Sequence, residues 1–415
     1  MYIERDIHPE IRKHIRRKEY TIITGARQSG KTTLLHALTS ELKDEGQQVG
    51  FVTFEDRDVL SAVNRHPEEI FTFIPRPGKS GVEISREAKT LYFFIDEVQY
   101  ADDPSNFLKY LFDTYGENLK ITATGSSAFY LDKKFTDSLA GRKRIFELQT
   151  LSFDEWLKFN DKPELARELK TIRRNKDYHS MRRREIIELF NEYLVFGGYP
   201  EVSLEKERNE KIALLKEIRD AFLKRDIDES GVSYPDKFYH LLSLLASQAG
   251  NLVNRNELSA TVGVDNKTIG KYLYVLQNCF HINLVRPFHS NLRKELTRMP
   301  KVYFKDAGLR NMALNRFHDF NSRADRGALL ENYVYKRLTG MFDTDHIRFW
   351  RTTGGNEIDF VIDTSFGEGL AFEVKMACRS GKTSSEKMFQ ENYPDYPLDI
   401  LSYKVDPGCN WVLKL

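Results

Sequence analysis

The stretch Gly25-Ala26-Arg27-Gln28-Ser29-Gly30-Lys31-Thr32 matches the pattern G-x-x-x-x-G-K-[ST], in which a glycine-rich turn holds phosphate. An apolar, β-branched run at 20–24 precedes it, and residues 33–38, beginning with Thr33, have the composition of a helix. Glycines let the backbone turn tightly with its N–H groups directed at an anion, and a helix N-terminus adds partial positive charge. Because strand, turn and helix follow in the required order, we interpret residues 25–33 as a nucleotide-binding P-loop.

Lys31 and Thr32 carry the expected chemistry of this loop. Lys31 is predicted to reach the β- and γ-phosphates of ATP, and Thr32 to ligate the Mg²⁺ that bridges them. The alternative is a chance match in a glycine-containing turn. The strand and the helix at the positions that the pattern requires argue against chance.

A second apolar run, at 91–95, ends in Asp96 and Glu97, and residues 49–54 predict another strand before it. A continuous apolar run is typical of a buried parallel strand, which would deliver both carboxylates to the C-terminal edge of the sheet. Asp96 is predicted to hold Mg²⁺, mostly through water, and Glu97 to orient and polarise the attacking water. Acids at strand ends are common, but these follow the P-loop by about 65 residues, as the second half of such a site should.

Several motifs occur in the order found in one protein family. They are the P-loop with residues 33–35, Phe94-Ile95-Asp96-Glu97-Val98-Gln99, Thr124-Gly125-Ser126-Ser127 and Ala140-Gly141-Arg142. In these motifs, and in segments at 151–156, 196–200 and 224–227, the sequence resembles a family of prokaryotic AAA-type ATPases that carry a C-terminal domain of unknown function. The resemblance runs essentially end to end, and it implies an architecture more than a cellular role.

Two further catalytic candidates follow. In AAA-type ATPases a polar side chain after the strand at 121–124 contacts the γ-phosphate and the attacking water; Ser126 is the candidate here, with Thr124 behind it. An ordinary exit from strand to turn is the alternative. Cations at 142–144 precede a short predicted strand. Arg142 is predicted to neutralise charge on the γ-phosphate, in cis or across a subunit interface, with solvated surface charge as the alternative.

Length and composition bound the class of protein. The 415 residues exceed what one hydrophobic core holds and suggest about two to four domains. The formal net charge of +2 requires any nucleic-acid surface to be a local patch. Cys279, Cys378 and Cys409 are far apart without a C-x-x-C pair, which indicates a reducing compartment and argues against a disulfide framework or a zinc knuckle. Because no apolar run approaches the roughly 18 residues of a membrane span, and no signal-peptide pattern is present, we expect a cytoplasmic protein that contacts no membrane.

The middle of the chain has helical spacing. Residues 152–235 are rich in Glu, Lys, Arg and Leu and predict a helical lid, interrupted by a corner at 196–200. Basic residues at 173–176 and 182–184 suit a nucleic-acid contact or a solvated helix face, and neighbouring glutamates favour the solvated face.

Residues 236–300 suggest a winged helix. Its predicted elements are helices at 238–249 and 256–260, a turn at 263–265, a recognition helix at 266–278 and a wing strand at 282–288. The outward residues expected on the recognition helix are Asn266, Lys267, Lys271 and Tyr272. In DNA-binding proteins of this kind the third helix enters the major groove. With two lysines on that helix, DNA contact and packing against the lid or another protein are equally supported.

A second group of chemical residues lies near the C-terminus. Glu331 is on a predicted helix at 327–335, and Asp359, Glu373 and Lys375 are on predicted strands. Glu373 and Lys375 alternate with apolar residues and are expected to project from one face of their strand. Together they match the D-x(n)-E-x-K pattern of restriction-endonuclease-like folds. Asp359 and Glu373 are predicted to ligate Mg²⁺ with Glu331 completing the acid cluster, and Lys375 to help activate water or steady the phosphate. An edge strand with solvated charges is the alternative, and the fold itself does not establish cleavage.

These inferences predict an α/β protein of four parts. They are an AAA-type P-loop ATPase core (1–151), a helical lid (152–235), a winged helix (236–300) and a restriction-endonuclease-like α/β domain (301–415). We predict that the chain binds ATP and Mg²⁺ and hydrolyses ATP to ADP and phosphate, coupled to DNA binding or processing through its C-terminal half. The alternative is a signalling-type nucleotide switch, or a partner-docking protein with an inactive nuclease-like domain. Besides ATP and DNA, the candidate partners are a second copy of the chain or another protein.

Overall fold

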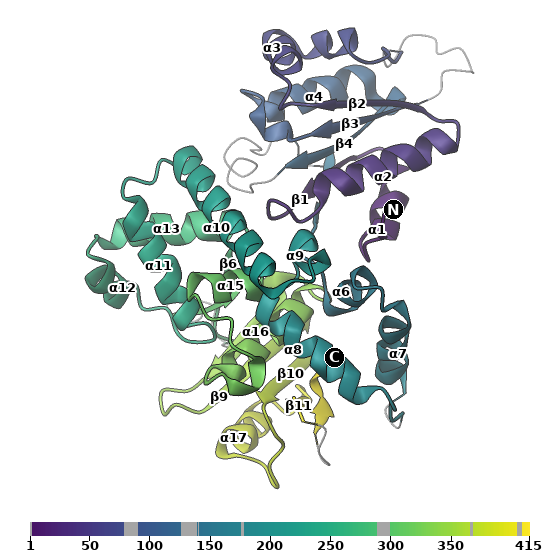
Figure 1. The fold of residues 1–415 in the computed structure, drawn as a ribbon. Helices are drawn as coiled ribbons and strands as arrows, with labels where there is room; N and C mark the ends of the chain where they lie inside the picture. Colours follow the sequence, from purple (N-terminus) through teal and green to yellow (C-terminus); the bar gives the residue numbers. More distant parts are fainter. Residues whose placement is uncertain are drawn as a thin grey trace. The chain divides into compact units, whose positions relative to one another are not determined.

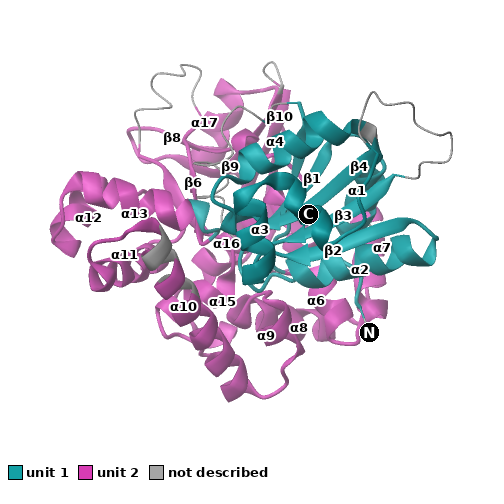
Figure 2. Ribbon diagram, turned by 90° about the horizontal axis from the view of Figure 1, so that it is seen from above, with its two compact units in different colours: residues 1–150, 278–280 teal, residues 151–277, 281–415 magenta. Residues whose placement is uncertain are grey.

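The computed structural model describes residues 2–78, 90–125, 139, 141–175, 178–288, 299–365, 368–404 and 409–415. Figure 1 shows the helices and strands in chain order. They form two compact units (Figure 2). Unit 1 comprises Met1–Thr150 with Asn278–Phe280, and unit 2 comprises Leu151–Gln277 with His281–Leu415.

Unit 1 is organised around a parallel sheet with the strand order β2-β3-β4-β1-β5. Its strands are β1 (Tyr20–Thr24), β2 (Gln48–Thr53), β3 (Leu91–Asp96), β4 (Leu119–Gly125) and β5 (Lys143–Glu147). All neighbouring strands pair in parallel, so the strands end at the same edge of the sheet. They coincide within two residues with the runs that the sequence predicted as strands, and the predicted α/β class is confirmed.

Helices cover both faces of this sheet. They are α1 (His8–Ile15), α2 (Lys31–Asp44), α3 (Arg57–Arg65) and α4 (Pro104–Tyr115). Leu35 of α2 shares one apolar cluster with Phe94, whereas Leu108 of α4 shares another with Phe93. Successive side chains of a strand point to opposite faces, which is why these neighbouring phenylalanines reach different clusters. A strand covered on both faces is buried along its length and is mostly apolar, as β1 and β3 are.

Unit 2 begins with helices where the sequence predicted helical spacing. They are α6 (Phe153–Phe159), α7 (Pro163–Arg174), α8 (Arg183–Phe196), α9 (Pro200–Leu204), α10 (Arg208–Ser230), α11 (Pro235–Ser247), α12 (Arg255–Val262) and α13 (Asn266–Asn278). The last three lie where the helices of a winged helix were predicted. The division of unit 2 into lid, winged helix and C-terminal domain stays a prediction.

A sharp corner separates α8 from α9, where the sequence predicted a break. Gly197 has a φ of +76°, and a Cβ on it would lie 2.1 Å from Asp306 Oδ1. A Cβ on Gly198 would lie 2.3 Å from the Leu151 carbonyl oxygen. The Asp306 carboxylate accepts a hydrogen bond from the Gly198 N–H at 2.9 Å. Backbone and carboxylate therefore occupy the space that side chains would need, and the corner requires both glycines.

The C-terminal part of unit 2 contains two sheets. β6 (Ile282–Val285) pairs antiparallel with β7 (Lys301–Phe304), so the domain border predicted at 300/301 lies between two strands that pair. The larger sheet is mixed and has the strand order β12-β11-β10-β9-β8. Its strands are β8 (Ile347–Arg351), β9 (Glu357–Ser365), β10 (Glu368–Lys375), β11 (Leu398–Ser402) and β12 (Asn410–Trp411). The helices in this part are α15 (Ala307–Ala313), α16 (Arg326–Thr339) and α17 (Ser384–Asn392).

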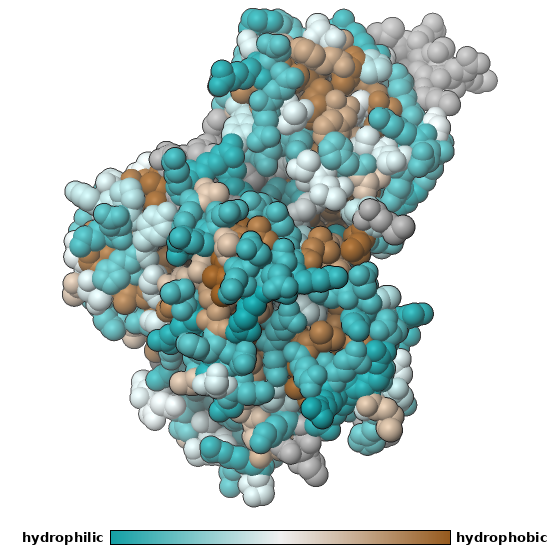
Figure 3. Space-filling view, in the orientation of Figure 1, coloured by the Kyte–Doolittle hydropathy of each residue, from teal (hydrophilic) through white to brown (hydrophobic). Residues whose placement is uncertain are grey.

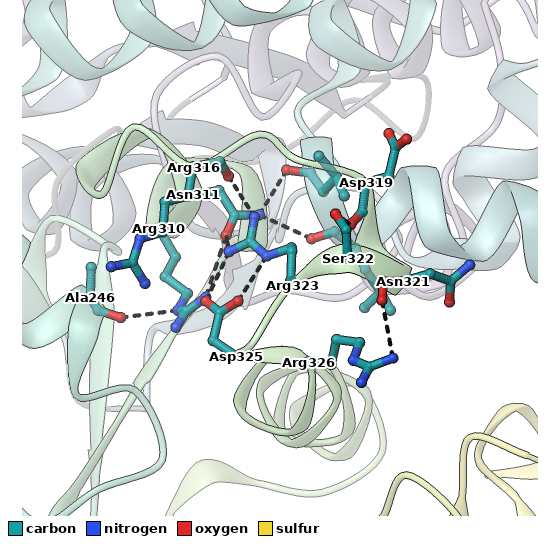
Figure 4. Close-up of polar contacts among 12 residues, drawn as sticks. Ala246, Arg310, Asn311, Arg316, Asp319, Asn321, Ser322, Arg323, Asp325 and Arg326 are labelled. Carbon is teal, nitrogen blue, oxygen red and sulfur yellow. Dashed lines mark hydrogen bonds and ion pairs between the residues drawn. The ribbon is translucent and has the colours of Figure 1, made fainter.

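A buried ionic network joins α11, α15 and the start of α16 (Figure 4). The Asp325 carboxylate accepts hydrogen bonds from Arg310 Nη1 at 2.7 Å and Arg323 Nε at 2.8 Å. Arg310 Nε also donates to the Ala246 carbonyl oxygen at 3.0 Å. Burial by itself would raise the pKa of Asp325, but the hydrogen bonds from Arg323 and Arg310 hold that pKa well below its usual range. Separating these groups would leave a buried charge without its partner, which would lower the free energy of unfolding. The network therefore holds the three helices in a fixed arrangement.

Cys378 and Cys409 form a disulfide with their Cα atoms 6.0 Å apart, so the argument against disulfides was wrong for this pair. The cysteines are separated by 31 residues, and their spacing carries no signal for pairing. The sheet register aligns Val374, Leu401 and Asn410 on three neighbouring strands, which brings the residue before β12 close to those after β10. The prediction of a reducing compartment relied on separated cysteines, and this bridge removes that support.

The exposed side chains of one face of the molecule are mostly polar. On the face shown in Figure 3, hydrophilic side chains predominate and apolar ones lie in separate groups between them. Exposed large apolar side chains include Phe73, Ile145 and Met181. Among the described residues, no helix is both long and apolar enough to cross a bilayer.

Candidate functional site

The loop between β1 and α2 has the backbone of an anion-binding turn. Gly25, Gln28 and Gly30 have φ angles of +146°, +56° and +95°. A Cβ on Gly25 would lie 2.2 Å from the Leu148 carbonyl oxygen, so only glycine fits there. Gly30 is the left-handed residue at which α2 begins. The loop thus leads into a helix N-terminus, where free N–H groups and the helix dipole favour an anion.

Lys31 is held by the loop itself. Its side chain is 5% exposed, and its Nζ donates to the carbonyl oxygens of Gly25 at 3.0 Å and Ala26 at 2.9 Å. Burial lowers the pKa of Lys31 to about 8, against the opposing effect of Glu97. Both of these acceptors are neutral, and a phosphate oxygen would be a stronger, charge-assisted acceptor for the same ammonium. The placement of Lys31 therefore fits a phosphate ligand.

Asp96, at the end of β3, accepts hydrogen bonds from hydroxyls of two other elements. Its Oδ2 accepts from Thr32 Oγ1 of α2 at 2.9 Å, and its Oδ1 accepts from Thr124 Oγ1 of β4. Both donors are neutral. Carboxylate and hydroxyl oxygens are the hard ligands that Mg²⁺ prefers, so Thr32 and Asp96 fit the metal-holding role predicted for them.

Glu97 is positioned by residues on both sides. It has a φ of +55°, a conformation that is rare for residues other than glycine and is concentrated at functional sites. Its N–H donates to Thr124 Oγ1 at 3.0 Å, and its side chain accepts a hydrogen bond from Gln99 Nε2. One hydroxyl, that of Thr124, thus contacts both acids. Sequence reasoning ranked Thr124 behind Ser126 and missed Gln99, although both lie in the motifs that carried the family resemblance.

The loop also contains a buried hydroxyl. Ser29 is fully buried, and among the described residues its Oγ has no hydrogen-bond partner. Buried polar groups nearly always have a partner. A buried hydroxyl without a partner in this turn fits a loop that receives phosphate.

The other two catalytic candidates are Ser126 and Arg142. Ser126 lies outside the described residues. Arg142 precedes β5, and its carbonyl oxygen accepts a hydrogen bond from the Tyr20 N–H at the start of β1 at 2.8 Å. It therefore lies at the edge of the sheet opposite to the P-loop, where its Nε donates to Asp113 Oδ1 at 3.0 Å. The predicted contact of Arg142 with the γ-phosphate in cis is wrong for this reason, and the contact across a subunit interface stays a prediction.

The C-terminal acids come together, but they do so around a lysine that sequence reasoning missed. Lys301, the first residue of β7, is 1% exposed. Its Nζ lies 3.2 Å from Glu331 Oε1 on α16. The same nitrogen lies 2.5 Å from Glu357 Oε1 and 3.8 Å from Asp359 Oδ1, both on β9. Glu357 was also missed, although it lies two residues before Asp359 on the same strand.

Glu373 and Lys375 of β10 lie beside this group. Lys375 Nζ donates to Glu373 Oε1, which agrees with their predicted position on one face of the strand. Glu373 Oε2 accepts from the Asp359 N–H at 3.2 Å, and Asp359 Oδ2 accepts from the Val374 N–H at 2.9 Å. Burial raises the pKa of Glu331 and of Glu373 to about 7 and also raises that of Asp359. Several carboxylates in a small buried volume disfavour one another's charge, which acts in the same direction.

The magnesium site predicted at Glu331, Asp359 and Glu373 does not fit this arrangement. The carboxylate oxygens that would ligate a metal ion contact the Lys301 ammonium or backbone N–H groups instead. In the part of the chain that the structure describes, no group of three or more His, Cys, Asp or Glu side chains is arranged to hold a metal ion. A metal ion at the same carboxylates would be repelled by the buried ammonium.

The predicted recognition helix, α13, presents part of the surface expected for DNA. Asn266, Lys267 and Lys271 are exposed, as predicted. Tyr272 is buried and packs edge-on against Phe238 with ring centroids 5.2 Å apart, so its predicted outward position was wrong. It belongs to an apolar stripe at helical spacing, formed by Ile269, Tyr272, Leu273 and Leu276.

Arginines of the basic cluster in the middle of the chain pair with acids. Arg173 donates to both carboxylate oxygens of Asp154, at 2.6 and 2.9 Å. Arg184 pairs with Glu188 at 3.0 Å one helical turn away. These pairs favour the structural and solvated interpretation of the cluster over a nucleic-acid contact.

Comparison with known families agrees with the motifs. An AAA domain family matches residues 17–157, a domain of unknown function (DUF8612) matches 187–319, and a second domain of unknown function (DUF4143) matches 326–408. An AAA domain in the N-terminal part and a domain of unknown function in the C-terminal part agree with the resemblance described above.

Similar proteins occur in bacteria and archaea. An uncharacterized protein of Methanocaldococcus jannaschii is 26% identical over 396 residues, which cover 92% of this chain and 81% of that protein. An uncharacterized protein of Mycobacterium tuberculosis is 24% identical over 379 residues, covering 90% of this chain and 74% of that protein. An uncharacterized protein of Haemophilus influenzae is 27% identical over 326 residues, which cover 76% of this chain and 73% of that protein.

Among solved structures, the ORC2 protein of Aeropyrum pernix in ADPNP–ADP complexes covers 81% of this chain and 97% of that chain, with a TM-score of 0.38 and 11% identity. AMPPCP-bound DnaA from Aquifex aeolicus covers 66% of this chain and 89% of that chain, with a TM-score of 0.29 and 16% identity. At these scores the likeness carries no information on function.

Proposed function

We propose that the chain binds ATP with Mg²⁺ through unit 1 and hydrolyses it to ADP and phosphate. The observation that carries this proposal is the contact of Thr32 with Asp96, which joins the P-loop helix to the acid-bearing strand at 2.9 Å. Lys31 and Thr32 start α2 directly after the loop. Asp96 ends β3, which is separated from β1 by β4, and Glu97 follows it directly. Phosphate-binding and acidic groups therefore meet at one edge of the sheet, as phosphoryl transfer to water requires.

Each residue has a defined task in this proposal. Lys31 leaves its loop carbonyl acceptors and pairs with the β- and γ-phosphates. Thr32 and Asp96 are the residues that would hold Mg²⁺, which neutralises phosphate charge when it is bound. Glu97 accepts a proton from, and orients, the water that attacks the γ-phosphate. Thr124 and Gln99 hold the two acids in position.

The proposal is tested by phosphate release and nucleotide binding in variants of the P-loop helix. Lys31→Ala should weaken ATP binding by about 100-fold, because a hydrogen bond to a charged group contributes up to about 3 kcal/mol. The matched control is Lys43→Ala, which removes an exposed lysine of the same helix. Unchanged ATP affinity in Lys31→Ala would rule out the P-loop assignment.

Coupling of this reaction to DNA stays a prediction that rests on the exposed Asn266, Lys267 and Lys271 of α13. It requires that ATP turnover change when DNA is added and that Lys267→Glu remove the change. The second candidate function is a nucleotide switch that docks a partner through a nuclease-like domain without nuclease activity. The Lys301 ammonium among the C-terminal acids favours this candidate, which expects slow turnover that is indifferent to DNA.

A further inference from the structure

The C-terminal acid cluster has its own cation. Lys301 is buried at the centre of Glu331, Glu357 and Asp359, with its Nζ at 3.2, 2.5 and 3.8 Å from one oxygen of each. The three carboxylates are more exposed than the lysine, at 17%, 23% and 14% of their side-chain area. The ammonium thus lies on the inner side of the carboxylates, at the point toward which they converge.

The backbone around Lys301 is fixed. Val285 of β6 pairs with Lys301 on one side, and Leu252 forms an antiparallel bridge with it on the other. The Val253 N–H donates to the Pro300 carbonyl oxygen at 2.7 Å. Phe349 lies under the ammonium, with 5.4 Å from Nζ to the ring centroid. With its strand held on both sides and its head group over an aromatic ring, Lys301 has little freedom to leave the carboxylates.

Most carboxylate oxygens of the cluster have further protein partners. Glu331 Oε1 accepts a second hydrogen bond from Tyr303 at 2.6 Å, and Glu357 Oε2 accepts one from Arg351 at 2.6 Å. Asp359 Oδ2 and both oxygens of Glu373 accept from Val374, Lys375 and Asp359. Among the described residues, seven of the eight oxygens of Glu331, Glu357, Asp359 and Glu373 therefore have a protein partner.

We propose that the Lys301 ammonium takes the place of a divalent metal ion among these carboxylates, so that the site neither binds Mg²⁺ nor cleaves nucleic acid. A divalent ion needs oxygen ligands at about 2.0–2.6 Å. Here one oxygen each of Glu331, Glu357 and Asp359 faces the ammonium of a lysine that cannot move out to solvent. The acids instead join β7 to α16, β9 and β10. This inference concerns unit 2 and is independent of ATP hydrolysis in unit 1.

The test is Mn²⁺ binding, measured by the electron paramagnetic resonance signal of free Mn²⁺ in the full chain without nucleotide. All proteins carry Asp96→Asn, which removes the carboxylate proposed to hold metal in unit 1. The parent should bind no Mn²⁺ at the acid cluster. Lys301→Met should gain one bound Mn²⁺ per chain, and adding Asp359→Asn to Lys301→Met should abolish the gain. Lys375→Met is the matched control, because it removes the other lysine of the cluster and leaves Lys301 in place, so it should gain nothing.

Two outcomes overturn the proposal. One is Mn²⁺ binding by the parent that disappears with Asp359→Asn, or nicking of plasmid DNA in Mg²⁺ or Mn²⁺ that depends on Asp359. The other is a folded Lys301→Met protein that binds no Mn²⁺. Circular dichroism checks the fold, and Lys301→Gln, whose amide keeps a donor for the carboxylates, replaces Lys301→Met in the measurement if that protein does not fold.

Discussion

Both units gather acidic side chains at strands of a buried sheet, and the two groups differ in their partners. Asp96 in unit 1 accepts hydrogen bonds from the hydroxyls of Thr32 and Thr124. The acids of unit 2 surround the buried ammonium of Lys301. A carboxylate paired with hydroxyls keeps its negative charge available to a cation, whereas one paired with a buried ammonium does not. Similar acidic patterns in a sequence therefore lead to different chemistry, depending on what faces them.

The largest expected difference between the sites is catalytic. Glu97→Gln should lower ATP turnover by about 100- to 10,000-fold, the usual contribution of a positioned general base. ATP affinity should be retained, because Glu97 acts on water rather than on the phosphates. Steady-state phosphate release and nucleotide binding measure the two effects.

The matched change in the other site is Glu357→Gln, which should leave ATP turnover unchanged. Equal losses of turnover in the two variants would show that the acid clusters are not functionally distinct, and normal turnover in Glu97→Gln would remove its assignment as the base.

The next effect is on stability and belongs to unit 2. Lys301→Met leaves the carboxylates without their buried partner and should reduce the free energy of unfolding by about 3–5 kcal/mol. Lys375→Met removes a lysine whose side chain is 33% exposed, and should cost about 1 kcal/mol or less. Urea unfolding followed by tryptophan emission is the measurement, because the three tryptophans, at 156, 350 and 411, all lie in unit 2. Equal losses in the two variants would contradict the central position of Lys301.

A smaller loss of ATP turnover is expected when a hydroxyl partner of the acids in unit 1 is removed. Thr124→Val removes hydrogen bonds to Asp96 and to the Glu97 N–H, one of them to a charged group, worth about 1.5–3 kcal/mol. If this loss appears in the transition state, turnover falls about 10- to 100-fold. Thr122→Val is the control, because Thr122 lies two residues earlier on the same face of the same strand. A Thr124→Val protein that turns over ATP as fast as Thr122→Val would exclude Thr124 from positioning the acids.

The smallest effect is the dependence of unit 2 on pH. Burial raises the pKa of Glu331 to about 7 from its ordinary value of 4.5, so the folded state binds a proton more tightly than the unfolded state. Its contribution to stability is full below the unfolded pKa and is lost as the pH rises through about 7. The tryptophan-monitored unfolding free energy should therefore fall on the order of 1–2 kcal/mol between about pH 5 and pH 8. Glu331→Gln should flatten this dependence, and an unchanged slope would contradict the pKa assignment.

Unit 1 contains a group whose contribution to stability changes with pH in the opposite direction. Burial and the neighbouring Lys120 lower the pKa of His14 to about 4 from 6.5. The folded state therefore disfavours the proton, and stability is lost as the pH falls below 6.5 toward 4. The contributions of Glu331 in unit 2 and His14 in unit 1 therefore respond to acid in opposite directions.

Much of unit 1 could be predicted from local patterns. Continuous apolar runs identified the strands, and the order of strand, glycine-rich turn and helix identified the P-loop, because these features depend on residues adjacent in the chain. Arg142 failed as a cis catalytic residue for a topological reason. It lies before its strand rather than after it, and the two ends of parallel strands are at opposite edges of a sheet.

Unit 2 was predicted less completely. The spacing of Glu373 and Lys375 indicated their shared face, and the helices at 235–278 were placed correctly. Tyr272 was assigned to the wrong face, because its position in the apolar stripe of the helix decides its burial. The partner of Cys378 also had no signal in the spacing of the cysteines.

The sequence by itself determined the parallel α/β core, the P-loop with Lys31 and Thr32, and the acids that end β3, because backbone conformation and side-chain periodicity are encoded locally. Only the tertiary structure decided what each acid faces. Thr32 reaches Asp96 across 64 residues of sequence, and Lys301 reaches Glu331 across 30. A hydroxyl partner leaves a carboxylate able to hold a metal ion, and a buried ammonium neutralises it, so the choice between an open and a closed acidic site is made by contacts that no local pattern contains.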